Sequence, residues 1–507
     1  MDLQAAINTA VPGSTIRIPD NERCVGNFVT DKPITLEGGP GSSIYSPNAM
    51  PAFDIKPATG PVVLKTLEFS VLDTAPLIYD IIRYGSGGAD QNSLDKVPQG
   101  LTVDRCDIHG QPKLDSQRGI AANGANFKIT NSKIWEIHGR GYDTQAICSW
   151  NGPGPFMILD CYLEAAGENI MFGGAAGSIP GLIPSDITIK RNHCFKPLSW
   201  YINDPSYAGL HWTVKNLFEL KNARRVVVDG NVFENNWADA QAGRSILFTP
   251  RPNDSGPSAV VEDVEFTNNV VKNVGSGVHL LGLDDLATTP AVILHRVRIA
   301  NNVFDNIDGP RFGSNGAFAT VINGTDGVTI EHNTVIHTGS MVIADYLPNT
   351  NFVYRSNISR HNDYGIFGSG HGIGNPAIDY YFPGSTITDN VIAKEVNAPW
   401  NVDQIYPAGQ VFPTTLAEVF SDVSKYQVAP AYAGKGADYN AILAAQGGTT
   451  PPDPIPTPIP PTTSIIRKVA WPTGEAKQNA VVELQWRERF RFKRHLSGAW
   501  AEFEYTP

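Results

Sequence analysis

A short phrase that recurs ten times is the feature that most constrains the fold of this chain. The phrase has an apolar residue, a spacer, a second apolar residue, two spacers and a small polar residue, as in "VVVDGN" and "VTIEHN". The polar residues lie 24 to 39 residues apart, within the period of roughly 20–50 residues that is typical of solenoids. They are Cys106, Ser132, Cys161, Asn192, Asn231, Asn269, Asn302, Asn333, Asn357 and Asn390.

The pattern of each phrase predicts a strand that ends at a corner. Apolar side chains two residues apart lie on one face of a strand and can point into a core. The units are rich in glycine and have no long helical period, which favours a parallel β-helix over a helical solenoid. Coils stack about 4.8 Å apart, so equivalent corners should lie in a file. The last seven corners are Asn, which tolerates left-handed geometry and can form an amide ladder.

Both ends of the repeats have features of their own. Leu3, Ala6, Ile7 and Ala10 give a short helix one apolar face, suited to covering the open end of a solenoid. We therefore predict an all-β parallel β-helix with an N-terminal capping helix over residues 1–446.

Composition changes sharply after the predicted solenoid. Residues 447–464 form a Pro-rich linker with seven prolines between Pro451 and Pro461, which favours a stiff, extended spacer. Residues 465–507 carry eight Lys and Arg against five Glu. Apolar and cationic residues alternate over 484–493, so this segment is predicted to be a small basic β-rich module.

Charge and composition exclude some partners and locations. The formal net charge of −11 argues against nucleic acid as a partner. No stretch reaches the ~18 consecutive apolar residues of a membrane span.

Cys106 and Cys161 stand two corners apart, at about 10 Å, too far for a disulfide. The first residues do not have the pattern of a signal peptide, and we expect that one has been removed from a secreted or surface protein.

With the ladder, the cap and the Asn corners, residues 1–445 resemble the pectate-lyase-like right-handed parallel β-helix superfamily. The stretches "GENIMFGG", "HWTVKNLFELKNARRVVVDGNVFENNWADAQ" and "SILFTPR" are similar to those of bacterial right-handed β-helix repeat proteins, most of which have no assigned activity. The superfamily contains polysaccharide lyases, glycoside hydrolases, pectin esterases and phage tailspikes. The resemblance therefore implies a right-handed coil, an extracellular location and a polysaccharide partner, and it leaves the chemistry open.

Four residues are candidates for catalysis. A lyase acting on uronic acid sugars needs a cation to neutralise the carboxylate, a base for the α-proton and an acid for the leaving oxygen. Lys221 or Arg251 could be the base or the neutraliser, and His211 and Glu219 are the other candidates. Glu219 and Lys221 are two residues apart and share a strand face. The alternative is a structural ladder of salt bridges on the solenoid.

The same coils are rich in residues suited to sugars. Aromatic faces can stack on the apolar patches of sugar rings, although a long loop can also pack its aromatics as a small core of its own. The predicted substrate-binding residues are Trp150, Glu168, Asn169, Trp200, Tyr207, Trp212 and Trp237.

Support for a metal or a hydrolase is weaker. Asp284 and Asp285 are the best acidic pair for Ca²⁺, although a turn with two solvated acids is the favoured interpretation. Gly370-His371-Gly372 is similar to a polygalacturonase signature, but the aspartate pair and the Arg-x-Lys of that signature are missing nearby.

We interpret the chain as an extracellular protein that binds a polysaccharide in a lateral groove over residues 140–285, and an acidic polysaccharide is favoured. If it is an enzyme, β-elimination is favoured over hydrolysis, and Ca²⁺ is a possible cofactor. Two alternatives stay open: a non-catalytic adhesin or surface scaffold, and a phage tailspike-like glycan-binding protein.

Overall fold

The computed structural model describes residues 1–284, 293–395 and 397–447, and the backbone of three strands near the C-terminus. The chain divides into two compact units, Met1–Pro452 and Asp453–Pro507.

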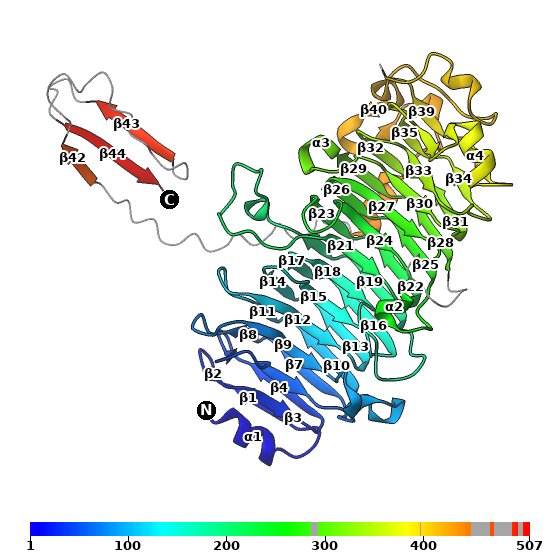
Figure 1. Cartoon of the computed structure of the whole chain (residues 1–507). Coiled ribbons are helices and arrows are strands. Elements are labelled where there is room, and N and C mark those ends of the chain that lie inside the picture. Colours follow the sequence, from blue (N-terminus) through cyan, green and yellow to red (C-terminus); the bar gives the residue numbers. More distant parts are fainter. Residues whose placement is uncertain (285–292, 396, 448–466, 471–488, 495–499, 507) are drawn as a thin grey trace. The chain divides into compact units, whose positions relative to one another are not determined.

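The first unit is a parallel β-helix built from three sheets of 13 strands each (Figure 1). Each strand pairs with its counterpart in the preceding and the following coil, and all these pairs are parallel except the last pair of the third sheet. This arrangement confirms the predicted all-β fold and is consistent with a right-handed coil.

The first sheet, sheet A, carries the strand that precedes each corner. Its strands are β1 (Thr15–Ile18), β4 (Ile34–Gly38), β7 (Val62–Lys65), β10 (Gln99–Asp104), β13 (Ala125–Thr130), β16 (Gly154–Leu159), β19 (Ser185–Lys190), β22 (Ala223–Asp229), β25 (Val261–Thr267), β28 (Leu294–Ala300), β31 (Asp326–Glu331), β34 (Val353–Arg355) and β38 (Thr386–Thr388).

Sheet B follows each corner. Its strands are β2 (Arg23–Val25), β5 (Ser43–Ser46), β8 (Glu68–Val71), β11 (Asp107–His109), β14 (Lys133–Ile137), β17 (Tyr162–Ala165), β20 (His193–Phe195), β23 (Val232–Asn236), β26 (Val270–Val274), β29 (Val303–Ile307), β32 (Thr334–His337), β35 (Ile358–Arg360) and β39 (Val391–Ala393).

Sheet C completes each coil. Its strands are β3 (Phe28–Thr30), β6 (Phe53–Ile55), β9 (Ile78–Tyr84), β12 (Ser116–Ala122), β15 (Gln145–Ser149), β18 (Glu168–Phe172), β21 (Asn216–Leu220), β24 (Arg244–Phe248), β27 (Ser276–Leu281), β30 (Ala319–Ile322), β33 (Val342–Asp345), β36 (Ile366–Gly368) and β37 (Gly372–Ile373).

The interior of the coil is filled by the apolar pairs that the repeat predicts. Val226 and Val228 of β22, for example, are fully buried. Phenylalanine rings contact one another between and within coils, with centroids 6.3 Å apart between Phe127 and Phe156 of successive coils and 5.0 Å apart between Phe156 and Phe172 of one coil. The core is therefore one continuous apolar column along the axis.

Seven buried asparagines form a hydrogen-bonded file at the corner between sheets A and B, which we call the asparagine ladder. In all six consecutive pairs the Nδ2 of one residue donates to the Oδ1 of the next at 2.9–3.1 Å. The backbone N–H of each donates to the same oxygen, as Asn231 does to Asn269 at 2.9 Å. The predicted file is confirmed, and its members are Asn192, Asn231, Asn269, Asn302, Asn333, Asn357 and Asn390.

The left-handed geometry lies one residue before the position that the sequence suggested. Asn268, Asn301 and His332 have φ of 56°, 55° and 51°, and each directly precedes a ladder residue. The ladder asparagine itself follows the bend, and its amide joins neighbouring coils.

Helices and short strands close the ends and flanks of the solenoid. Helix α1 (Leu3–Thr9) buries Leu3 and Ile7 against the first coil, as predicted. The other helices are α2 (Pro252–Ser255), α3 (Gly309–Phe312), α4 (Asn375–Tyr381) and α5 (Tyr439–Ala445), and β40 (Phe420–Asp422) pairs with β41 (Gln427–Val428) near the last coils. No described helix has the length and apolar character needed to cross a bilayer.

The second unit contains an antiparallel sheet in the order β42 (Arg467–Ala470), β44 (Trp500–Thr506), β43 (Arg489–Arg494). Part of the predicted cationic strand is β43. Most of the Pro-rich linker lies outside the described residues.

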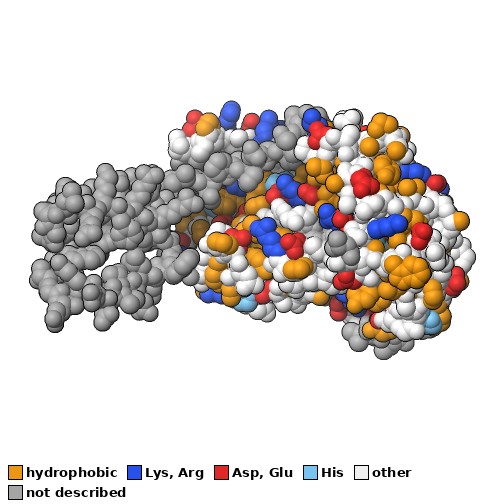
Figure 2. Space-filling model, turned by 90° about the horizontal axis from the view of Figure 1, so that it is seen from above, with side chains coloured by type: hydrophobic (Ala, Val, Ile, Leu, Met, Phe, Trp, Pro, Cys, Tyr) orange, Lys and Arg blue, Asp and Glu red, His pale blue; other side chains and the backbone are white. Residues whose placement is uncertain are grey.

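Charges on the solenoid surface are mostly paired between coils. On the face seen in Figure 2, Lys and Arg side chains are interspersed with Asp and Glu and form no large patch of one sign. Arg225 bonds Asp186 at 2.7 Å one coil away. All five cysteines are free and buried.

Candidate functional site

A group of charged side chains lies on sheet C between β18 and β27. On β21 the alternation buries Phe218 and Leu220 in the core, so Glu219 between them faces outward. Glu219 is in register with Met171 of β18 and Leu247 of β24, and Leu247 with His279 of β27. We call Glu168, Lys215, Glu219, Lys221, Arg244 and His279 the sheet-C cluster.

Glu219 and Lys221 lie on the same face, as their spacing indicates. The Nζ of Lys221 is 3.8 Å from the Oε1 of Glu219 and 3.9 Å from the Oδ2 of Asp254. Both distances exceed a hydrogen bond. Asn216 holds the buried Glu219 by donating to its Oε2 at 2.9 Å. The Lys221 ammonium therefore lies between two carboxylates without being tied to either.

Glu168 is fully buried beside Glu219. Gln145 donates to its Oε2 at 2.8 Å, and the Nζ of Lys215 is 3.8 Å from its Oε1. Burial, together with the charges of Glu219 and Asp143, raises the pKa of Glu168 to about 7. Its carboxyl group can therefore hold a proton close to neutral pH.

Arg244 is the cation that the sequence analysis missed. It begins β24, and its guanidinium is half-buried with no ion pair to any described carboxylate. Burial lowers its pKa. Buried guanidinium groups are normally paired, so this unpaired cation distinguishes the cluster from the surface ladders.

His279, also missed, lies buried next to these cations. Burial and the charges of Arg244 and Arg251 hold the pKa of His279 well below its ordinary value, so the imidazole is neutral. Its Nδ1 has no hydrogen-bond partner among the described residues. His279 could have been found from its outward position between Val278 and Leu280 of β27, had the strand bounds been known.

Arg251 bonds one of the predicted calcium ligands. Its Nη1 lies 2.7 Å from the Oδ1 of the buried Asp284. Asp285 lies outside the described residues. Across the described part of the chain, no group of three or more His, Cys, Asp or Glu is placed to hold a metal ion. A calcium site therefore stays a prediction.

Three of the predicted aromatic residues are buried. Trp200, Trp212 and Trp237 are 5%, 2% and 2% exposed and form a small apolar cluster with Tyr201 and Phe312. The long loop between β20 and β21 thus packs its aromatics as its own core, and these tryptophans are not an exposed sugar platform. Trp150 and Tyr207, in contrast, are half-buried.

Two other predicted residues lie apart from the cluster's charges. The exposed His211 bonds Asp239 at 2.6 Å, and no described contact joins it to the sheet-C cluster. The buried Asn169 donates to the carbonyls of Leu163 and Phe195 at 2.7 and 3.0 Å, which makes it a brace of the turn between sheets B and C.

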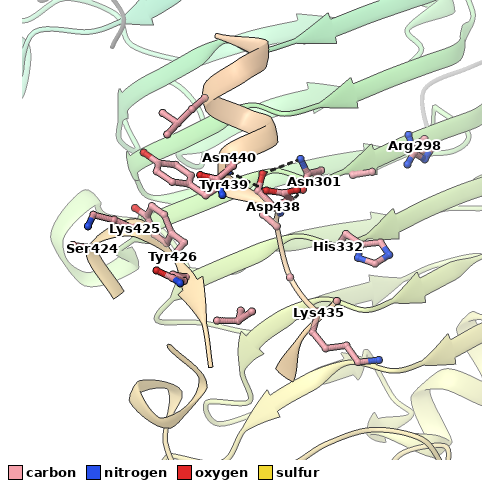
Figure 3. Close-up of a pocket in the computed structure, with 17 residues that line it drawn as sticks. Arg298, Asn301, His332, Ser424, Lys425, Tyr426, Lys435, Asp438, Tyr439 and Asn440 are labelled. Atoms are coloured by element: carbon pink, nitrogen blue, oxygen red, sulfur yellow. Dashed lines mark hydrogen bonds between the residues drawn. The ribbon is translucent and has the colours of Figure 1, made fainter. Parts of the chain in front are cut away.

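A cavity of about 820 Å³ lies elsewhere, where residues 424–443 pack over the corner at Asn301 and His332 (Figure 3). Its cations are already paired, Lys435 with Asp389 at 2.9 Å and Arg298 with Glu331 at 2.7 Å. Because these cations are already paired, the cavity is less suited to an anionic ligand than the sheet-C cluster is.

No protein-family model matches the sequence, and no curated protein matches it. Among solved structures, the fold is similar to a PL6-family polysaccharide lyase from Pseudopedobacter saltans, with 14% identity over 86% of this chain and 94% of that chain and a TM-score of 0.39. It is also similar to a mannuronic-acid-specific family 6 lyase from human gut microbiota (12% identity, 88% and 96% coverage, TM-score 0.40). A third is the surface protein and adhesin PfbA of Streptococcus pneumoniae (9%, 81% and 94%, TM-score 0.35). At these identities and scores no activity transfers to this chain.

Proposed function

We propose that the protein binds an acidic polysaccharide across sheet C and cleaves it by β-elimination outside the cell. The observation that carries this proposal is Arg244, a half-buried guanidinium without a described carboxylate partner. A uronic acid carboxylate is the partner that such a fork of donors fits. Pairing with it would also withdraw charge from the carbon next to the carboxylate.

Two other groups of the sheet-C cluster are suited to the two proton transfers. In the proposed step, neutral His279 takes the α-proton of the uronate, the bond from carbon to the glycosidic oxygen breaks, and a carbon–carbon double bond forms. Lys221 gives a proton to the departing oxygen. The Glu219 carboxylate lies 3.8 Å from the Lys221 ammonium, and Arg251 adds positive charge near His279.

A non-catalytic glycan-binding role is the second candidate. It is favoured by the bond between Arg251 and the buried Asp284. A bond of this kind can be part of a structural ladder of salt bridges and does not require a catalytic role for Arg251. In this case Arg244 would still bind the sugar carboxylate, but no bond would break.

Incubation with uronic acid polysaccharides, polymannuronate and polygalacturonate among them, tests the proposal through the ultraviolet absorbance of the unsaturated product. Parallel reactions with Ca²⁺ and with a chelator test the calcium prediction. A rise in absorbance that disappears in Arg244→Gln supports the lyase. Binding on a glycan array with no absorbance change under any condition would favour the adhesin, and absence of both would reject the glycan site.

A further inference from the structure

A smaller cavity of about 400 Å³ lies at the ends of strands β9, β12 and β15, on the same sheet as the cluster. Its lining includes Asp80 and Arg83 of β9, Arg118 of β12, Gly87 and Trp150. None of these belongs to the sheet-C cluster. The cavity combines an aromatic ring with two guanidinium groups.

The charges in this cavity leave one cation in excess. Arg118 and Arg83 share the carboxylate of the buried Asp80, at 3.3 and 3.0 Å, and Arg83 is also 3.9 Å from Asp54. The nearby Asp54 is bonded by Lys56 at 2.7 Å. The Nε of Arg118 is buried and has no hydrogen-bond partner among the described residues. The Arg118 side chain as a whole is 23% exposed, so the outer nitrogens of its guanidinium can reach a ligand carboxylate.

The Trp150 ring is fixed next to Arg118, whose guanidinium carbon lies 5.1 Å from the ring centroid. The backbone N–H of Trp150 donates to the Oδ1 of Asn123 at 2.9 Å. A Cβ at Gly87 would come within 2.2 Å of the indole Nε1, so the rim opposite the ring has to be glycine. The ring is therefore positioned before any ligand arrives, which lowers the entropic cost of binding.

The cavity lies along one line with the proposed reaction centre. Ser149, Phe172 and Leu220 are in register on β15, β18 and β21, and the residues that follow them are Trp150, Gly173 and Lys221. Two strand spacings separate the backbones of Trp150 and Lys221 by about 10 Å. The coil between them carries Gly173 and Gly174 at this place, and the side chain of Met171 packs against Gly174.

From this geometry we propose that Trp150, Arg118 and Arg83 form a distal subsite of the polysaccharide site. It binds a uronic acid ring of the same sugar chain, a few rings from the bond that is cleaved. The ring packs on Trp150, and its carboxylate pairs with the two guanidinium groups. This inference rests on the proposed lyase function, and it predicts that long substrates are preferred over short ones.

The test compares kcat/KM for hexasaccharides and disaccharides prepared from polymannuronate and polygalacturonate. The two rings of a disaccharide only flank the bond that is cleaved and cannot reach the distal subsite, whereas a hexasaccharide can. In Trp150→Ala and Arg118→Gln, the ratio of hexasaccharide to disaccharide kcat/KM should fall about tenfold, which corresponds to about 1.4 kcal/mol. Trp150→Phe, which keeps an aromatic face, should retain most of the ratio.

Trp135 offers a matched control because it is also half-buried but lies on sheet B, where its Nε1 bonds Asp107 at 2.6 Å. Trp135→Ala should leave the ratio unchanged. Wild-type cleavage with an unchanged ratio in Trp150→Ala and Arg118→Gln overturns the distal subsite alone. An equal loss at both lengths also overturns it, since that is the mark of general damage to the fold. Absence of wild-type cleavage at either length overturns the lyase function and this inference with it.

Discussion

The asparagine ladder and the sheet-C cluster both place polar side chains on successive coils, but they leave those side chains in different states. In the ladder every amide is satisfied by the next coil at 2.9–3.1 Å. In the cluster Arg244 has no described carboxylate partner, and Lys221 lies 3.8 Å from its nearest carboxylate oxygen. The ladder repeats one interaction to hold the coil together, whereas the cluster keeps groups available for a ligand. Polar groups that are satisfied by the next coil therefore serve stability, and polar groups that are left available serve function, although both lie on the same repeating coils.

The largest expected effect comes from removing a reacting group of the cluster. Lys221→Ala should lower kcat by about 10²–10⁴-fold, because the proposed step assigns the protonation of the departing oxygen to this ammonium. Thermal unfolding should change little, since Lys221 is tied to neither carboxylate. Lys272→Ala is the control, because its ammonium pairs with Glu234 at 3.2 Å on sheet B. Full activity of Lys221→Ala would remove this residue from the mechanism.

Removing one amide from the ladder should instead affect stability. In Asn269→Ala, the backbone N–H and the Nδ2 of the buried Asn231 lose their shared acceptor. Each buried group left unsatisfied costs about 1–3 kcal/mol, so the free energy of unfolding in urea should fall by about 3 kcal/mol. Asn440→Ala, at an exposed position of α5, is the control. If both variants unfold alike, the ladder does not hold the coils together.

Glu168 allows the buried carboxyls of the cluster to be tested through pH. Its folded pKa of about 7 is above the ordinary 4.5, so the folded state favours the protonated form. Ionising Glu168 in the folded state therefore lowers the free energy of unfolding. This penalty is absent below pH 4.5 and grows as the pH rises towards 7. Glu168→Gln should gain stability over wild type by up to about 2 kcal/mol at pH 8 and by little at pH 4.5. A gain that is the same at both pH values would contradict the raised pKa.

The smallest effect is expected for the exposed ion pairs that join neighbouring coils of sheet A. Arg296 bonds Glu262 and Asp263 at 2.8 and 2.6 Å, and its own side chain is 54% exposed. Pairs of this kind contribute about 0–1 kcal/mol, so Arg296→Ala should shift the free energy of unfolding by less than about 1 kcal/mol. A loss as large as that of Asn269→Ala would mean that surface charges, and not buried amides, set the stability.

The repeat made the coil and its corner predictable, because burial and stacking impose the same residues on every coil. The apolar pairs, the cap at Leu3 and Ile7 and the file of asparagines were all evident in the sequence. The sheet B strand was not, since runs such as His193–Phe195 are too short to show a period.

The candidate site was only partly predictable. Glu219 and Lys221 could be placed on one face by their spacing alone. Trp200 and Trp212 were misplaced because composition does not tell whether a long loop packs inward or presents its rings. Arg244 is a charged residue at the start of a strand. That it has no carboxylate partner can be recognised only in the folded structure, so no local sequence pattern marks it.

The most direct test of the account is a crystal structure of Lys221→Ala with a uronic acid hexasaccharide bound. The account predicts a sugar chain along sheet C, with one carboxylate paired to Arg244 and another near Arg118. Sugar bound only at the cavity beside Tyr439, or only on the loop that carries His211, would contradict it.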